Sequence, residues 1–337
     1  MTFWKSLFVF VILLVVAVGV AYLYVSNYHQ PLSVDDVAYG ATFSKLRAEE
    51  LNLPWQETYD ALLDELGVRK LRLVAHWDMV EPAEGVFTFD ELDYQMRRAE
   101  EVGAEVILAI GRRLPSWPEC HEPEWAADDT RVRQEQQLAY MRAVVERYQD
   151  SPALKWWQVE NEPFIIGYAR EQCGELDVPF LDEEIALVRQ LDPAHPMLLT
   201  ASGELGLFNN TWNRADVFGT TLYRSVWNLD LNSYITYPLP PSLYRAKLAF
   251  VELLSGERKP AIIAELALES WTPQATRDTP LSEQLSRMNL QIFDETIQYA
   301  AETGFPEQYV WGAEWWYYLK KTHDYPELWE RGKELFK

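Results

Sequence analysis

Along residues 37–337, short apolar runs alternate with longer segments in which apolar side chains recur every three or four positions. The short runs are typical of buried strands in a parallel sheet, and the longer segments of amphipathic helices. Strands are predicted at residues 37–43, 70–75, 105–110, 154–162, 196–202, 217–223, 260–265 and 308–312. Helices are predicted at residues 54–66, 90–102, 131–148, 182–191, 242–254, 281–303 and 326–336. Strands that alternate with helices about eight times predict an α/β fold, a (β/α)8 TIM barrel.

The amino terminus has a different pattern. Residues 7–25 are 19 residues without a charge, which as a helix would extend about 28 Å, close to the thickness of a bilayer core. Lys5 precedes this run, whereas Asp35 and Asp36 follow it. The positive-inside rule then places the amino terminus in the cytoplasm and the barrel outside it, at the cell membrane.

A cleaved signal peptide is the alternative, because residues 19–21 (Gly-Val-Ala) offer small side chains. The apolar run continues past that point, so a retained single-pass anchor that contacts the lipid bilayer is favoured. The chain is therefore expected to comprise an anchor and linker at residues 1–30 and a barrel at residues 31–337.

Composition narrows the classes of partner. The net charge of −22 leaves no basic patch to offset phosphates, which argues against nucleic acid as a partner. Fourteen tryptophans and eighteen tyrosines exceed ordinary core needs, and flat aromatic rings suit the apolar faces of sugars. Cys120 and Cys173 fall in loops at the same end of the predicted barrel, where they form either one disulfide or two buried thiols.

Two glutamates stand out because each ends a predicted strand. Glu162 ends the fourth strand and Glu265 ends the seventh, 103 residues later. Period-two alternation places Glu160 on the same face as Glu162, and Ile263 on the same face as Glu265. In a barrel, catalytic groups lie at the carboxyl ends of strands, and glycosidic hydrolysis requires two carboxyl groups, one protonated and one ionised. Glu162 and Glu265 are therefore the predicted catalytic pair.

The motifs around them resemble clan A of the glycoside hydrolases, which are retaining (β/α)8 enzymes. Residues 157–163, Trp-Gln-Val-Glu-Asn-Glu-Pro, resemble the strand-four signature of that clan. The resemblance implies that Glu162 is the acid/base and that Asn161 binds the sugar 2-hydroxyl. Residues 262–265, Ile-Ile-Ala-Glu, resemble the nucleophile strand, and Arg72 occupies the place of the strand-two arginine that supports the nucleophile.

Further positions follow from the same resemblance. Tyr223 corresponds to a strand-six tyrosine that contacts the nucleophile, and Trp311 or Trp315 to a strand-eight tryptophan beneath the central sugar. Residues 77–87 resemble the segment that follows strand two in several of these families. Strand three ends in Gly-Arg-Arg at residues 111–113 instead of the histidine common in family 5, so no numbered family is assigned.

Five further candidate residues each have two possible roles. His76, Trp77 and Trp271 follow predicted strand ends and are expected to contact substrate, unless they only pack the loops. Arg112 and Arg113 suit an acidic sugar, but pairing with the many carboxylates of this acidic chain is favoured.

The expected protein is a membrane-anchored retaining β-glycosidase acting on a cell-envelope or exported polysaccharide or oligosaccharide. The retaining mechanism requires the two carboxyl groups to lie about 5–5.5 Å apart. Because both catalytic groups are carboxylates, no metal or organic cofactor is expected. A non-catalytic carbohydrate-binding protein on the same barrel and a transglycosylase are the alternatives.

Overall fold

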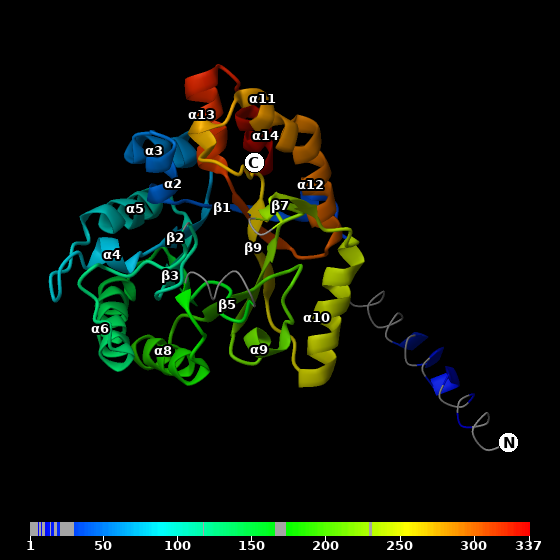
Figure 1. Cartoon of the computed structure of the whole chain (residues 1–337), viewed down its shortest axis with the longest axis horizontal. Coiled ribbons are helices and arrows are strands. Elements are labelled where there is room, and N and C mark those ends of the chain that lie inside the picture. Colours follow the sequence, from blue (N-terminus) through cyan, green and yellow to red (C-terminus); the bar gives the residue numbers. More distant parts are fainter. Residues whose placement is uncertain are drawn as a thin grey trace.

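The computed structural model describes residues 30–116, 118–165, 173–228 and 231–337, with isolated positions between 6 and 20 (Figure 1). Eight parallel strands form a closed barrel in the order β1-β10-β9-β6-β5-β4-β3-β2, which confirms the predicted barrel. The strands are β1 (Ala38–Thr42), β2 (Lys70–Val74), β3 (Glu105–Ile110), β4 (Leu154–Val159), β5 (Met197–Ala201), β6 (Val217–Leu222), β9 (Ala261–Ala267) and β10 (Glu307–Trp311).

Helices follow the strands and cover the barrel from outside (Figure 1). They are α2 (Lys45–Glu50), α3 (Trp55–Asp64), α4 (Trp77–Val80), α5 (Asp90–Glu101), α6 (Thr130–Tyr148), α8 (Val178–Leu191), α9 (Asn209–Trp212), α10 (Pro241–Ser255), α11 (Leu281–Arg287), α12 (Leu290–Glu302), α13 (Ala313–His323) and α14 (Glu327–Leu335). The predicted helices at 54–66, 90–102, 131–148, 242–254 and 326–336 agree with α3, α5, α6, α10 and α14 to within two residues at either end.

Each strand divides its apolar side chains between two layers. Ile107, Leu198, Val217, Ile262 and Tyr309 form a small cluster of strand residues inside the barrel. Their sequence neighbours belong to the much larger cluster between the strands and the helices. Both faces of these strands are therefore buried, which explains why their sequences are mostly apolar.

Two helical predictions need correction, and one long helix was not predicted. The predicted helix 281–303 is two helices, because Met288 and Asn289 are extended and the Asn289 side chain accepts a hydrogen bond from the Ile292 amide (3.1 Å). Asparagine competes for backbone donors in this way and begins a new helix. The helix predicted at 182–191 begins earlier, at Val178, where Asp177 caps it through the Phe180 amide. The helix α13 was not predicted.

Two segments after the barrel strands were also missed. A two-stranded antiparallel hairpin, β7 (Ser225–Asn228) and β8 (Ser233–Thr236), follows β6 and precedes α10. Its four-residue strands are too short to give a distinct period-two signal.

The strand β9 contains an irregularity that the alternation rule missed. In its pairing with β6, Thr220 opposes Ile263 but Thr221 opposes Glu265, so Ala264 is an extra residue. A β-bulge of this kind shifts the faces of the residues that follow it. Ile263 belongs to the outer apolar cluster, whereas Ala264 belongs to the inner one. The prediction that Ile263 and Glu265 share a face is therefore wrong, and Glu265 points into the barrel because of the bulge.

The strand β4 ends at Val159, earlier than predicted. Beyond it, Glu160 and Glu162 have left-handed backbone conformations with φ of 56° and 45°. Alternation therefore fails here too, and the two side chains do not share a face.

The chain enters the barrel at the amino-terminal ends of the strands. The Leu32 amide donates to the carbonyl of Ala301, and the Ala38 amide to that of Pro306, just before β10. Among the described residues, no helix has both the length and the apolar character needed to cross a bilayer. The predicted anchor at residues 7–25 lies for the most part outside the described residues.

Candidate active site

Arg72 is the centre of a polar network inside the barrel. Its side chain lies on β2 and is fully buried. Its Nη1 donates to Glu265 Oε1 (2.6 Å), its Nε to Gln158 Oε1 (2.7 Å) and its Nη2 to Asn161 Oδ1 (2.9 Å). A buried guanidinium is tolerated when its donors are satisfied and a carboxylate offsets its charge. Arg72 therefore lies beside Glu265, the position that the resemblance implies.

Glu265 has a donor on each carboxyl oxygen. Arg72 donates to Oε1, and the Tyr223 hydroxyl donates to Oε2 at 2.8 Å. Burial, followed by the nearby Glu265 charge, raises the pKa of Tyr223 well above its usual range, so its hydroxyl keeps its proton and remains a donor. Arg72 and Tyr223 therefore occupy both carboxyl oxygens of Glu265 with hydrogen-bond donors and hold the group in one orientation.

Glu162 lies in the opposite electrostatic setting. The Thr221 hydroxyl donates to its Oε1 (2.8 Å), and Thr221 is the residue of β6 that opposes Glu265. Glu162 and Glu265 therefore flank the same position on β6. Burial, and secondly the charge of Glu265, raises the pKa of Glu162 to about 8. A raised pKa of this size keeps the proton on Glu162 at neutral pH.

Asn161 shares a hydrogen-bond partner with each glutamate, Arg72 with Glu265 and Thr200 with the Glu162 amide. Its Oδ1 accepts hydrogen bonds from Arg72 (2.9 Å), Gln158 (3.3 Å) and Thr200 (3.2 Å). These contacts fix the amide so that its NH2 group points away from them. The amide is therefore held in one orientation with its donors available to another acceptor.

Glu160 links two segments of the chain. Its carboxylate accepts from the backbone amides of Arg112 and Arg113, both at 2.7 Å, and from Gln137 Nε2 at 3.1 Å. Glu160 therefore joins β4 to the loop after β3.

Trp271 and Trp311 lie near the network. The Trp271 ring packs edge-on against Tyr223 with centroids 5.4 Å apart, and 39% of the residue is exposed. Trp311 is partly exposed at the end of β10, and its Nε1 donates to Glu269 Oε1 (2.8 Å). Of the two tryptophans proposed beneath the central sugar, Trp311 is therefore the one that a ligand can reach.

Three predicted contacts are buried elsewhere and need correction. Trp315 is fully buried in α13 and donates to Gln284 Oε1. Trp77 is fully buried in α4, stacks on Tyr140 and donates to Glu81. Both indoles fill the layer outside the barrel, so neither can contact a substrate in this structure.

His76 is the third. It is 3% exposed, its Nε2 donates to the Pro115 carbonyl (3.1 Å), and its ring lies 4.1 Å from that of His121. Burial lowers the pKa of His76 well below its usual range, so it is a neutral histidine that packs the loop.

The loop after β3 contains the remaining predicted residues. Cys120 forms a disulfide with Cys173, with Cα atoms 5.5 Å apart. Arg112 pairs with Glu122 (2.8 Å) and Arg113 with Glu119 (2.9 Å). Both arginines are therefore neutralised by carboxylates, the reading that the sequence favoured over an acidic sugar.

Sequence reasoning missed several members of this network. Thr200 and Thr221 hold Glu162 through its backbone amide and its carboxyl group, respectively. Both are polar residues within otherwise apolar strands, and that signal was available. Glu119 was also missed, since only the loop conformation brings it back to Arg113.

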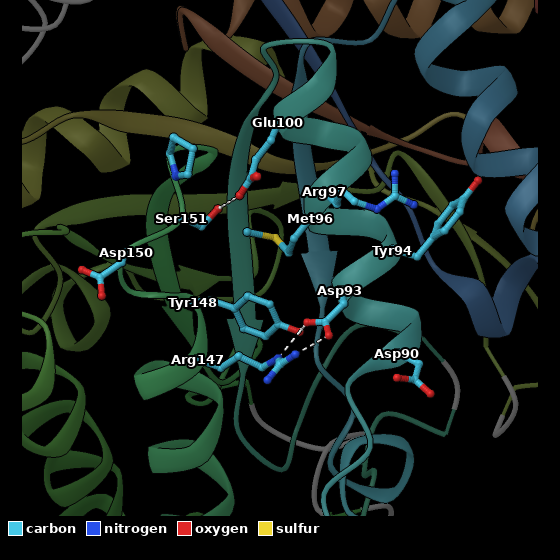
Figure 2. A pocket seen from close by; sticks show the side chains of 11 residues that line it. Asp90, Asp93, Tyr94, Met96, Arg97, Glu100, Arg147, Tyr148, Asp150 and Ser151 are labelled. Carbon is cyan, nitrogen blue, oxygen red and sulfur yellow. Dashed lines mark hydrogen bonds and ion pairs between the residues drawn. The ribbon is translucent and has the colours of Figure 1, made fainter.

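A separate hollow of about 680 Å³ lies outside the barrel, between α5 and α6. Figure 2 shows Arg147 and Tyr148 of α6 pointing toward Asp93 of α5. These groups satisfy one another, and none of the predicted site residues lines the hollow. Within the described part of the chain, no group of histidine, cysteine, aspartate and glutamate could hold a metal ion.

A family model described as β-galactosidase matches residues 52–139. A β-galactosidase from an Arthrobacter species is 32% identical over 120 residues, which are 30% of this chain and 17% of that protein. β-Galactosidase GanA of Bacillus subtilis is 31% identical over 134 residues, 32% of this chain and 20% of that protein. A probable mannan endo-1,4-β-mannosidase F of Neosartorya fischeri is 28% identical over 134 residues, 36% and 27% of the two chains. The chain thus spans less than a third of the length of these relatives.

Solved structures share the fold. A family 1 β-glucosidase from Exiguobacterium antarcticum aligns with a TM-score of 0.52 at 13% identity, over 82% of this chain and 88% of that chain. A family 5 mannosidase from Rhizomucor miehei aligns with a TM-score of 0.54 at 14% identity, over 84% and 82% of the two chains. Together these matches confirm the resemblance to the clan A (β/α)8 glycosidases and single out no numbered family.

Proposed function

We propose that this chain is a retaining β-glycosidase with Glu265 as nucleophile and Glu162 as acid/base. The observation that carries the proposal is the opposite setting of the two carboxyl groups. Arg72 and Tyr223 each donate a hydrogen bond to the carboxyl group of Glu265, whereas burial and then the nearby Glu265 raise the pKa of Glu162. The names of the relatives, β-galactosidases and mannosidases, support a glycosidic bond as the target.

The proposed reaction has two displacements. A carboxylate oxygen of Glu265 attacks the anomeric carbon while the bond to the leaving oxygen breaks, and Glu162 gives its proton to that oxygen. Glu162, now ionised, then takes a proton from water, whose oxygen attacks the anomeric carbon and releases Glu265. Two inversions restore the original anomeric configuration. Asn161 is placed to donate its NH2 group to a hydroxyl of the sugar.

The proposed substrate is a cell-envelope or exported polysaccharide or oligosaccharide. The relatives make β-galactosides and β-mannosides the first compounds to try, with β-glucosides beside them.

The test is the rate of the full-length protein on aryl β-D-galactoside, mannoside and glucoside. Glu162→Gln is expected to reduce turnover by about 10²–10⁴-fold on a substrate with a poor leaving group. Glu265→Gln removes the nucleophile and is expected to reduce turnover more. Glu307→Gln, on a strand glutamate at the amino-terminal end of β10, is the matched control and should retain activity.

Product analysis decides between the alternatives. An acceptor sugar that appears in the product in place of water indicates a transglycosylase. If no glycoside or polysaccharide is cleaved, but one binds equally to the wild type and both variants, the protein is a carbohydrate-binding module and the proposal fails.

We also propose that residues 7–25 anchor the protein in the membrane, with the amino terminus cytoplasmic and the barrel outside. The uncharged run and the flanking Lys5, Asp35 and Asp36 support this orientation. The chain joins the barrel at the end opposite Glu162 and Glu265, so an anchored barrel directs its catalytic end away from the bilayer. Alkaline extraction of membranes tests the anchor. An intact amino terminus in the membrane pellet supports it, whereas a soluble protein that begins after residue 21 indicates a cleaved signal peptide.

A further inference from the structure

The loop after β3 brings two charged side chains back to the acid/base. Arg113 and Cys120 form an isolated antiparallel bridge, and the Leu114 amide donates to the carbonyl of Glu119 (2.9 Å). Cys120 is tied to Cys173, which follows β4 in the sequence. The loop is therefore held closed on both sides, and it presents Arg113 and Glu119 together.

Arg113 contacts the main chain at the acid/base and at the residue before it. It is 5% exposed, and its Nη1 donates to the backbone carbonyl of Glu162 at 2.8 Å. Its own carbonyl accepts from the Asn161 amide at 2.7 Å. Glu162 has a φ of 45°, a conformation that costs free energy for a residue with a side chain unless its surroundings enforce it. The two contacts with Arg113 supply part of that constraint.

Glu119 is the partner of Arg113. Its Oε2 accepts from Nη2 (2.9 Å) and Nε (3.2 Å) of the guanidinium. Glu119 also has a left-handed backbone, with a φ of 70°, which is unusual for glutamate and indicates that the loop is built to present this side chain.

The electrostatic consequence follows from distance and sign. A lone guanidinium beside Glu162 would favour loss of its proton, whereas a carboxylate beside that guanidinium opposes the effect. In agreement, Arg113 lowers and Glu119 raises the pKa of Glu162, after the larger effects of burial and Glu265. The charged and titratable groups around Glu162 and its network are Arg72, Glu265, Tyr223, Tyr237, Arg113 and Glu119.

We infer that Arg113 and Glu119 are positioning residues for the acid/base: Arg113 fixes the main chain of Glu162, and Glu119 balances the Arg113 charge so that Glu162 keeps its proton. The inference rests on the proposed function, because it gives the pair a purpose only if Glu162 is the proton donor. It assigns a role to an ion pair that acts on the main chain of Glu162 and does not itself take part in the two displacements.

The test is a direct titration of Glu162 in full-length protein, by NMR of 13C-labelled glutamate carboxyl groups, with the Glu162→Gln variant to assign the signal. Glu119→Gln is expected to lower the pKa of Glu162 by about half a unit to one unit. Glu119→Asn removes the same charge with a residue that accepts left-handed backbone, which guards against failure to fold. Glu122→Gln is the matched control, because Glu122 pairs with the neighbouring Arg112 on the same loop.

The expected result is a lowered pKa in both Glu119 variants and an unchanged one in Glu122→Gln. An unchanged pKa in the Glu119 variants, or an equal shift in Glu122→Gln, would overturn the inference. Arg113→Lys keeps the positive charge but cannot donate to the Glu162 carbonyl and to Glu119 at the same time. It should therefore reduce kcat while changing the pKa of Glu162 less than the Glu119 variants do. The NMR signal is present whether or not a glycoside is cleaved, so failure of this inference is distinct from failure of the proposed function.

Discussion

At the residue scale, the central fact is that Glu162 is protonated where most glutamates are not. Its carboxyl group is buried beside Glu265, and its pKa is raised to about 8. The unfolded chain has no such surroundings, so the same carboxyl group ionises there near pH 4.3 or so. Between these two pH values, ionisation of Glu162 stabilises the unfolded chain but not the folded protein, and the free energy of unfolding is lowered accordingly.

Removing this carboxyl group should stabilise the protein near neutral pH. Because the folded pKa is raised, the contribution of Glu162 to stability is fully present below the unfolded pKa and is lost as the pH rises toward the folded pKa. Glu162→Gln should raise the free energy of unfolding by about 1–3 kcal/mol at pH 7 relative to its effect at pH 4. Urea unfolding of the wild type and variant at both pH values measures this. An identical pH dependence in the two proteins would mean that Glu162 is ionised in the fold.

The same proton should control the rate. On aryl glycosides with poor leaving groups, kcat/KM is expected to fall above about pH 8, as Glu162 loses its proton in the free enzyme. A 2,4-dinitrophenyl leaving group needs no proton, so its kcat/KM should remain level through that region. If kcat/KM instead falls above pH 8 in the same way for both substrates, a group other than Glu162 causes the decrease.

The side-chain directions at the site could be predicted only in part. Glu162 and Glu265 were predicted as the catalytic pair because each ends an apolar strand, but simple alternation assigned the wrong face-sharing neighbour to both. Ala264 is an extra residue in β9, and Glu160 and Glu162 have left-handed backbones. Bulges and positive φ values depend on neighbouring strands, and a single sequence does not encode them in its apolar pattern.

At the element scale, the strands were predictable because each is a short apolar run between polar loops. The helix α13 was not, because residues 313–319 read Ala-Glu-Trp-Trp-Tyr-Tyr-Leu, a sequence in which aromatic side chains look like ligand contacts. In the fold, Trp315 and Trp316 are fully buried between the barrel and its neighbours. A large number of aromatic residues therefore does not by itself distinguish rings that contact a sugar from rings that pack a buried helix.

The break between α11 and α12 should be sensitive to its capping residue. Asn289 accepts from the Ile292 amide at 3.1 Å and begins α12. Asn289→Ala is expected to reduce the free energy of unfolding by about 1 kcal/mol, whereas Asn289→Ser should retain most of it, because serine is also a good capping residue. Urea unfolding compares the three proteins. If both variants lose the same free energy of unfolding, Asn289 does not stabilise the protein through helix capping.

At the scale of the whole molecule, charge limits the choice of substrate. The chain has a net charge of −22, and three arginines at and around the proposed active site are paired: Arg72 with Glu265, Arg112 with Glu122 and Arg113 with Glu119. The net negative charge would therefore repel a polyanionic polysaccharide at long range. At short range, these three arginines are already paired with carboxylates of the protein.

Neutral polymers should accordingly be cleaved faster than anionic ones. A uronate-bearing polysaccharide tested before and after removal of its methyl esters provides a matched pair, because the two differ mainly in charge. The esterified form is expected to react faster at low salt, and the difference should shrink as ionic strength rises, because the Debye length falls from about 30 Å at 0.01 M to about 8 Å at 0.15 M. Initial rates at both salt concentrations decide the matter. A preference for the de-esterified polymer at low salt would instead mean that an arginine such as Arg112 or Arg113 exchanges its carboxylate partner for that of the substrate.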